Sequence, residues 1–376
     1  MNTTLHSQNY STAPVLYMAM ELDDKHWKLR FSNGSKKRSK TVEALNQDQL
    51  LSEIGQSKER LKLPTDCKVI ACYEAGWEGF WLALWLQSVG VTIYVVDSSA
   101  IEVNRRKRRT KTDRVDAEKL LQLLQRYVQG EKDALHVVNI PSVEDADARR
   151  LHRERKTLVA ERGRHWTRIK SLVRAQGLRI TSKRDVPAQL EALRCWNGEP
   201  LPPDLHAELM REWARYELVD SQVHELEALQ KARVAEGGSM AMRQIQGLMA
   251  LKAVGWQSAW LLVYELFAWR QFRNRRELAS LVGLTPTPYS SGDDEREQGI
   301  SKAGNRRVRT AMIELAWLWL THQPGSALSR WYRRRFGEGG KRLRRIGIVA
   351  LARKLLVALW RYLEFGEIPA GATFSR

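Results

Sequence analysis

Cysteine is scarce in this sequence, and its arrangement offers neither a metal site nor a disulfide framework. The 376 residues include three cysteines, Cys67, Cys72 and Cys195, and no Cys/His spacing resembles a zinc site. Cys72 lies in an apolar run typical of a strand, where a thiol is most simply a small core residue. We therefore expect a reducing compartment, with no part for disulfides.

Long apolar runs are also missing. No segment approaches the roughly 20 apolar residues needed to span a bilayer. The polar residues 1–14 lack the charged start and the apolar core of a secretory signal. We therefore expect a cytoplasmic protein with no membrane contact.

Acidic residues are too few to balance the basic ones. The chain carries 62 Lys and Arg against 43 Asp and Glu, which gives a formal charge of +19 and a pI near 10.0. No long acidic run neutralises this excess internally, so we expect a polyanionic partner, namely nucleic acid. Apolar residues at 43% allow two or three domains with cores of their own.

The first third of the chain has the pattern of an α/β domain. Two runs, 15–20 and 69–73, are apolar on both faces, as central strands of a covered sheet are. Around them the pattern predicts further strands at 26–31, 39–42 and 91–96 and helices at 48–61, at 77–87 and from about 113. Three strands, helix, strand, helix, strand, helix is the order of a ribonuclease H-like domain.

Four carboxylates stand at informative places in this order. Glu21 and Glu74 end two central strands, and Asp113 and Asp116 share one face at the start of a helix. Each alone has a structural explanation: Asp113 suits a helix cap, and Glu21 resembles its solvated acidic neighbours. Converging together, they would repel one another unless divalent cations, Mg²⁺ or Mn²⁺, neutralise them. Two such ions suit phosphoryl transfer.

A basic cluster lies directly before the aspartate pair. It comprises Arg105, Arg106, Lys107, Arg108 and Arg109. Such a cluster suits phosphate, so we expect it to contact nucleic acid.

The middle of the chain changes to long helical patterns. Residues 143–178 and 204–233 carry apolar stripes at helical spacing, the second close to a heptad seam. They predict an antiparallel hairpin or an oligomerising coiled coil. The arginine-rich face of the first is either solvated or in contact with nucleic acid. Residues 248–266 then resemble a helix-hairpin-helix around Ala253-Val254-Gly255.

A second group of candidate residues follows residue 281. Residues 281–292 predict a tight loop marked by Pro286, Pro288 and Gly292, which presents two hydroxyls, Ser290 and Ser291. The segment 299–309 adds polar and basic side chains around it: Lys302, Asn305, Arg306, Arg307 and Arg309. Cations and a bound metal could activate a serine for attack on phosphorus. The commoner meaning of Ser-Ser-Gly is a turn with solvated hydroxyls.

Three sequence blocks together resemble the transposases of the insertion sequence 110 family, in the branch of insertion sequence 1111. They are Lys-Thr-Asp-Arg-Val-Asp-Ala at 111–117, Gly-Leu-Thr-Pro-Thr-Pro-Tyr-Ser-Ser-Gly at 283–292 and Gly-Ile-Ser-Lys-Ala-Gly-Asn at 299–305. Ala-Arg-Lys-Leu-Leu at 352–356 is a weaker fourth. The resemblance implies a RuvC-like (ribonuclease H-like) domain at 1–135 and a coiled-coil helical linker at 136–240. A mostly helical transposase domain would occupy 241–376.

The resemblance also assigns roles to the candidate residues. It implies an Asp-Glu-Asp-Asp metal tetrad on Glu21, Glu74, Asp113 and Asp116, in which Glu21 departs from the family pattern by one methylene. A serine, Ser291 in preference to Ser290, would attack DNA and form a phosphoserine.

The implied partners are donor and target DNA, a guide RNA encoded by the element, and further copies of the chain in a dimer or tetramer. A bacterial cytoplasmic enzyme, bound to the nucleoid when active, fits this resemblance. Two alternatives remain: a structure-specific RuvC-like endonuclease that uses the tetrad alone, and a non-catalytic nucleic-acid scaffold whose tetrad has decayed.

Overall fold

The computed structural model describes residues 13–76, 78–97, 113–291 and 294–375. The chain divides into two compact units, Met1–Pro141 and Ser142–Arg376. None of the helices in the described residues is long and apolar enough to cross a membrane.

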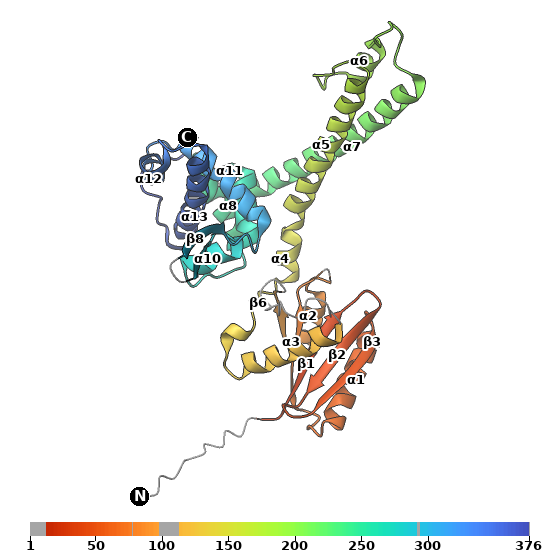
Figure 1. The fold of residues 1–376 in the computed structure, drawn as a ribbon, viewed down its shortest axis with the longest axis vertical. Coiled ribbons are helices and arrows are strands. Elements are labelled where there is room, and N and C mark those ends of the chain that lie inside the picture. Colours follow the sequence, from red (N-terminus) through yellow and green to blue (C-terminus); the bar gives the residue numbers. More distant parts are fainter. Residues whose placement is uncertain (1–12, 77, 98–112, 292–293, 376) are drawn as a thin grey trace, which may run out of the picture. The chain divides into compact units, whose positions relative to one another are not determined.

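The first unit is built on a six-stranded mixed sheet in the order β3-β2-β1-β4-β5-β6 (Figure 1). The strands are β1 (Val15–Leu22), β2 (His26–Ser32), β3 (Lys37–Glu43), β4 (Lys68–Glu74), β5 (Thr92–Val96) and β6 (Val137–Val138). Strand β1 is antiparallel to β2 and parallel to β4, which is parallel to β5. This mixed sheet is consistent with a nuclease-like domain.

Helices cover both faces of the sheet. On one face, α1 (Gln47–Arg60) and α2 (Trp81–Ser88) pack on side chains that include Met18, Met20 and Tyr73. On the other face, the leucines of α3 (Asp113–Val128) pack on Ala19 and Cys72. Successive strand residues point to opposite faces, and the prediction that β1 and β4 are apolar on both faces is confirmed.

Cys72 is a core residue, as predicted. Its side chain is fully buried, and burial raises the pKa of the thiol well above its usual range. All three cysteines are free.

The element bounds differ from the expected ones in two informative places. Strand β1 continues to Leu22, so Glu21 lies inside the strand instead of ending it. The short edge strand β6 pairs with the end of β5, and the sequence did not predict it. Two residues are too few to form an alternating pattern.

In the second unit, two long helices form an antiparallel hairpin (Figure 1). They are α5 (Arg150–Ala175), which follows α4 (Val143–Ala148), and α7 (Pro203–Glu236); the short α6 (Val186–Ala192) lies between them in the chain. Later residues of α5 pair with earlier residues of α7, in the ion pairs Arg155–Glu227, Arg162–Asp220 and Arg168–Glu208. The hairpin alternative is therefore observed within one chain, and part of the arginine face of α5 pairs with the acids of α7.

The remaining elements surround a separate core that includes Trp260, Trp319 and Leu355. The helices are α8 (Met240–Ala250), α9 (Trp256–Leu262) with its π-helical extension η4 (Val263–Phe267), α10 (Arg275–Val282), α11 (Arg306–His322), α12 (Ala327–Phe336) and α13 (Lys341–Phe365). The predicted tight loop is instead a hairpin of β7 (Pro286–Ser291) and β8 (Asp294–Ile300).

The turn between α8 and α9 adopts the left-handed backbone at Ala253, with φ 81°. The amide of Lys252 donates to the carbonyl of Thr373 (3.1 Å), and that of Val254 donates to Leu251 (3.1 Å). These two amides therefore have partners inside the protein. Phosphate binding by the other amides of this helix-hairpin-helix-like turn stays a prediction.

Two of the sequence blocks cross at the base of the β7–β8 hairpin. The amide of Asn305 donates to the carbonyl of Leu281 (2.8 Å), and that of Ser301 donates to Thr285 (2.9 Å). Gly283 and Gly304 both have positive φ, and a Cβ on Gly304 would overlap the carbonyl oxygen of Leu281. Only glycine allows the two backbones to approach this closely.

We expect Gly304→Ala to lower the free energy of unfolding by about 3 kcal/mol or more, because it adds an overlap to an unfavourable φ. The matched control is Gly299→Ala. This glycine has φ +90°, and among the described residues other than its chain neighbours no heavy atom lies within 4 Å of an added Cβ. The control should lose only about 1 kcal/mol. Urea unfolding of the full chain measures both. Equal losses would show that the two backbones do not cross as described.

Candidate functional site

Glu21 and Glu74 occupy equivalent places on neighbouring parallel strands. The register of β1 and β4 pairs Met20 with Tyr73, and each glutamate is the next residue along its strand. In-register neighbours of a parallel pair lie on the same face of the sheet. Since Ala19 and Cys72, two residues earlier, belong to the core beneath α3, both glutamates belong to that face. The two glutamates are therefore neighbours in the backbone of the sheet, and their convergence with the aspartates on a metal stays a prediction.

Asp113 and Asp116 lie in the first turn of the helix that covers the same face. Helix α3 begins at Asp113, and its leucines Leu120, Leu121 and Leu124 anchor it on the sheet. The ion pair of Arg30 with Glu118 (3.3 Å) further joins α3 to β2. The side chains of Asp113 and Asp116 lie outside the described residues, so their place in a tetrad stays a prediction.

The donor chemistry of these four positions fits a hard divalent cation. All four are carboxylates, which Mg²⁺ and Mn²⁺ prefer to the nitrogen and sulfur ligands of softer metals. Among the residues whose side chains are described, no three acidic, histidine or cysteine side chains gather into a metal-binding group. The aspartates of α3, whose side chains lie outside the described residues, would complete the predicted tetrad.

The two serines are the last residues of β7. Ser290 pairs in register with Glu295, and Ser291 pairs with Asp294, on the strand that returns from the hairpin end. The sequence reading did not anticipate these acidic positions opposite both serines, because it predicted a loop there. Gly292 lies outside the described residues.

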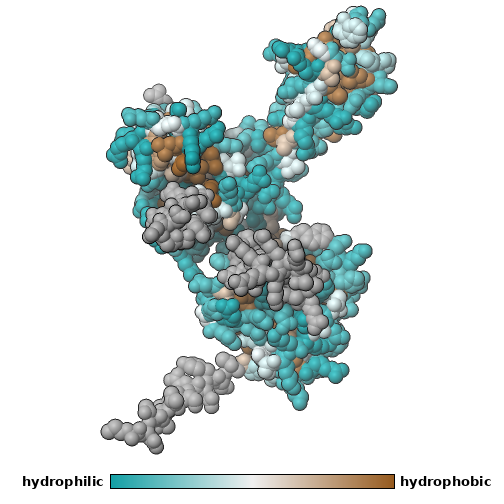
Figure 2. Space-filling model, in the orientation of Figure 1, coloured by the Kyte–Doolittle hydropathy of each residue, from teal (hydrophilic) through white to brown (hydrophobic). Residues whose placement is uncertain are grey.

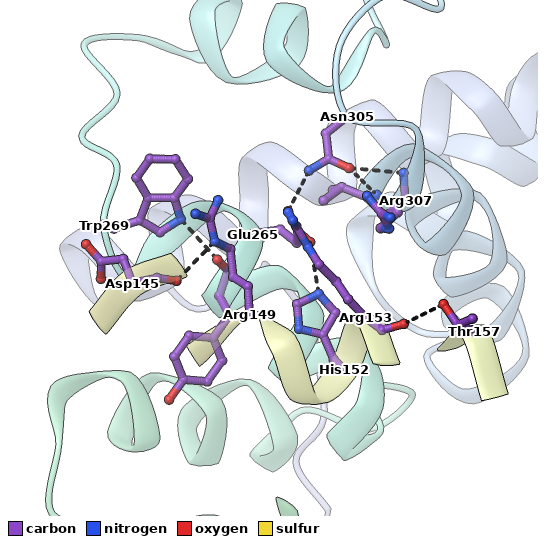
Figure 3. Close-up of polar contacts among 11 residues, drawn as sticks. Asp145, Arg149, His152, Arg153, Thr157, Glu265, Trp269, Asn305 and Arg307 are labelled. Carbon is purple, nitrogen blue, oxygen red and sulfur yellow. Dashed lines mark hydrogen bonds and ion pairs between the residues drawn. The ribbon is translucent and has the colours of Figure 1, made fainter. Parts of the chain in front are cut away.

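Asn305 follows the β7–β8 hairpin, and its half-buried side chain lies at the start of α11, next to Glu265 (Figure 3). Its side-chain oxygen caps α11 by accepting from the amides of Arg307 (3.0 Å) and Val308 (3.2 Å). Its side-chain nitrogen donates to Oε2 of Glu265 at 3.0 Å. These contacts give Asn305 a structural role, and its predicted contact with nucleic acid is not tested by them.

Glu265 is the centre of a buried polar cluster (Figure 3). The residue is 2% exposed, and its carboxylate accepts from both guanidinium edges of Arg153 (2.8 Å each) and from Nε2 of His152 (2.9 Å), besides Asn305. Burial alone raises the pKa of Glu265, but the hydrogen bonds from His152 and Arg153 outweigh it and hold the pKa well below its usual range. The carboxylate is therefore ionised and joins three segments: α5, η4 and the start of α11.

Two more arginines lie beside this cluster without a carboxylate of their own among the described residues. The Cζ atoms of Arg149 and Arg270 lie 4.5 and 4.0 Å from the ring centroid of Trp269. Burial, together with repulsion by Arg149, lowers the pKa of Arg270 to about 10. Two guanidinium groups therefore lie close to the one indole ring of Trp269.

The basic residues of segment 299–309, which were predicted to contact nucleic acid, differ in their exposure to solvent. Lys302, Arg306 and Arg307 are exposed and can reach a ligand. Arg309 is half-buried, and its Nη1 donates to the carbonyls of Val282 (3.0 Å) and Ala303 (3.1 Å). The cluster Arg105–Arg109 lies outside the described residues.

Sequence reading missed Glu265, although one signal was available. A single acid stands in the apolar run Val263-Tyr264-Glu265-Leu266-Phe267. A buried acid of this kind needs partners, but they come from positions 40 and more than 100 residues away.

We expect Glu265→Gln to lower the free energy of unfolding by about 3 kcal/mol or more at neutral pH, because Arg153 and His152 would lose their buried acceptor charge. The pKa of Glu265 is lower in the folded chain than in the unfolded chain, where it is about 4.3. The ionised carboxylate therefore stabilises the fold above that pH, and this contribution is lost as the pH falls below it. The difference between the wild type and the variant should therefore shrink in acid. Urea titrations at several pH values measure it.

Glu154→Gln is the matched control, because this α5 glutamate is exposed and has no recorded polar partner among the described residues. It should change stability by less than about 0.5 kcal/mol. A Glu265→Gln variant as stable as this control would contradict the role given to the cluster.

Two family models match the chain. A family model described as Transposase IS116/IS110/IS902 family matches residues 245–333, and a DEDD-type IS110 model described as Transposase matches residues 23–176. The first range contains the serine hairpin and Asn305. The second contains Glu74 and both aspartates of α3, and begins two residues after Glu21.

Whole-chain relatives point the same way. The chain is 40% identical to the putative transposase y4rJ of Sinorhizobium fredii, over 96% of this chain and 95% of that protein. It is 27% identical to the transposase for insertion sequence element IS1111A of Coxiella burnetii, over 68% of each chain. It is 26% identical to the transposase for IS1328 of Yersinia enterocolitica, over 69% of this chain and 73% of that one. The resemblance in the sequence blocks is confirmed: the chain belongs to the IS110/IS116/IS902 family of transposases, enzymes that cleave and rejoin DNA.

Proposed function

We propose that this transposase moves an insertion sequence by means of a metal-bound carboxylate tetrad and a serine nucleophile, under the guidance of an RNA encoded by the element. The observation that carries the tetrad is the register of β1 and β4, which gives Glu21 and Glu74 equivalent places on the α3 face. The strand order, with β1 between an antiparallel and a parallel neighbour, supports a ribonuclease H-like domain of the RuvC type.

In this proposal Glu21, Glu74, Asp113 and Asp116 together hold Mg²⁺ or Mn²⁺. A bound divalent cation would neutralise the converging carboxylates and stabilise the charge that develops at the phosphorus. The dipole at the start of α3 favours negative charge there, so the first turn of the helix suits two aspartates. The longer Glu21 would change the geometry at one corner of the site.

The nucleophile in this proposal is Ser291, with Ser290 as the alternative. The serine oxygen bonds to a DNA phosphorus, the bond from phosphorus to the leaving strand breaks, and the proton passes to the hydroxyl end that is released. The phosphoserine ester keeps the energy of the broken bond, so attack by another hydroxyl end rejoins DNA without a further energy source. The rigid base of the hairpin, at Gly283, Gly304 and Asn305, supports a fixed position for the serines.

RNA guidance and a shared site are the remaining parts of the proposal. A charge of +19 supports binding to two nucleic acids at once. We place the reaction in a dimer or tetramer in the bacterial cytoplasm, at the nucleoid, with tetrad and serine contributed by different subunits. Sequencing the RNA that co-purifies with the protein tests the guide, and a lack of element-derived RNA would contradict it.

Two alternative functions would need fewer of the candidate residues than a transposase does. A structure-specific RuvC-like endonuclease would need the carboxylates but no serine, and a nucleic-acid scaffold would need neither. The crossing of two sequence blocks beneath the serines favours the transposase mechanism over both, because neither alternative requires a built serine hairpin.

We expect Ser291→Ala to abolish strand exchange on a nicked donor substrate, and Ser290→Ala to reduce it far less. Each change removes only a hydroxyl, so the fold should be kept and DNA binding should remain. Gel analysis under denaturing conditions measures the protein–DNA adduct and the exchanged product. Full strand exchange by both variants would rule out the serine mechanism, whereas the reverse order would assign Ser290 as the nucleophile.

A further inference from the structure

A dense cluster of positive charge lies where α12 meets α13. Residues 330–345, called the basic corner below, contain eight arginines and lysines and one acid, Glu338. Its net charge of +7 compares with +19 for the whole chain. All eight basic residues are exposed, and none of them has an ion-pair partner among the described residues. Figure 2 shows hydrophilic residues gathered over α12.

The basic corner is rigidly built. The hydroxyl of Tyr332 donates to the carbonyl of Arg344 at 3.2 Å, which joins the two helices across the turn. A Cβ at Gly347 would overlap the ring of Phe336, so this glycine lets α13 approach α12. These contacts fix the two helices against each other on either side of the turn.

The aromatic side chains of the basic corner point inward. Tyr332 and Phe336 are buried, and their ring centroids lie 5.8 Å apart. Trp331 is half-buried between Phe336 and the ammonium of Lys354, which lies 4.7 Å from the centroid of its ring. No aromatic ring of the basic corner is thus exposed for stacking on an unpaired base, which is how single strands are usually held. The surface offers charge without a means of reading bases.

We propose that the basic corner of α12 and α13 is a docking surface for the phosphate backbone of duplex DNA. A rigid surface with eight exposed basic side chains and one acid suits a partner with regularly spaced negative charges, and it contacts that partner without regard to sequence. Duplex DNA is the partner chosen because the family cleaves and rejoins DNA. The proposal rests on that chemistry alone and on neither the tetrad nor the serine.

The test uses a triple substitution, Arg334→Gln, Arg342→Gln and Arg345→Gln, in the full chain. Each of these side chains is exposed and has no hydrogen bond, ion pair or ring contact with other described residues, so the fold should be kept. Affinity for a duplex of arbitrary sequence is measured in EDTA, where cleavage cannot interfere, at 50 and 200 mM salt. The loss of about three phosphate contacts should weaken the dependence of affinity on salt. The ratio of wild-type to variant affinity should therefore fall roughly forty-fold between 50 and 200 mM salt.

Two controls separate position from total charge. Arg60→Gln, Lys62→Gln and Lys68→Gln, near the end of α1 and at the start of β4, remove the same charge from exposed positions that are assigned to no ligand. This first-unit variant should keep most of the salt dependence. The same three corner positions changed from arginine to lysine keep their charge and should bind as the wild type does.

Three outcomes would overturn the proposal. An equal loss in the first-unit variant would mean that binding follows net charge, and unchanged duplex binding by the corner variant would mean that DNA lies elsewhere. A loss confined to an RNA duplex of the same length, measured in parallel, would assign the surface to RNA. Because no cleavage is measured, these outcomes are independent of whether the serine mechanism holds.

Discussion

One buried carboxylate organises the part of the second unit that carries the serine hairpin. Glu265 accepts four hydrogen bonds from His152, Arg153 and Asn305. Removing one partner from a buried charged cluster typically costs about 3–5 kcal/mol, because the remaining charges stay buried without compensation. Each of the three segments is therefore held in place by the same acceptor. The first turn of α5 and the start of α11 cannot move independently while this cluster is intact.

Asn305 extends this constraint to the hairpin. Its side chain has one end on Glu265 and the other on the first amides of α11. Its own amide donates to Leu281, where the chain enters the crossing formed at Gly283 and Gly304. The end of the hairpin that lies opposite the serines is thus fixed by backbone hydrogen bonds and, through Asn305, by the buried carboxylate of Glu265. In the first unit, the register of β1 and β4 positions the candidate residues, because it gives Glu21 and Glu74 equivalent places on neighbouring strands.

The sequence predicted the first unit well because strong local patterns determine it. The apolar runs of β1 and β4 and the leucines of α3 indicated a covered sheet and its order, and the structure has both. Glu21 was expected after the strand and lies within it, since a polar residue near the end of an apolar run does not mark where pairing stops. The pairing of Arg155 with Glu227 depends on how two helices align, which no local pattern contains.

The second unit was harder to predict at the positions that matter most. Pro286 and Pro288 favoured a loop, and the charged stretch after Gly292 lacks the alternation of a strand. Their pairing as β7 and β8 comes from the crossing beneath them, which depends on two glycines far from the hairpin end. Glu265 depends in the same way on partners distant in the sequence. These are contacts of tertiary structure, and local composition cannot encode them.

The central claim is that the carboxylates and the serine act in one reaction. It is tested most directly by measuring the covalent protein–DNA adduct on a nicked donor substrate in magnesium, for the wild type and for Glu74→Gln, with peptide mapping of the modified residue. The account predicts an adduct on Ser291 or Ser290 in the wild type and a loss of about a hundred-fold or more in Glu74→Gln, as expected when charge stabilisation at the reacting phosphorus is removed. An adduct that forms at the wild-type rate in Glu74→Gln would contradict it.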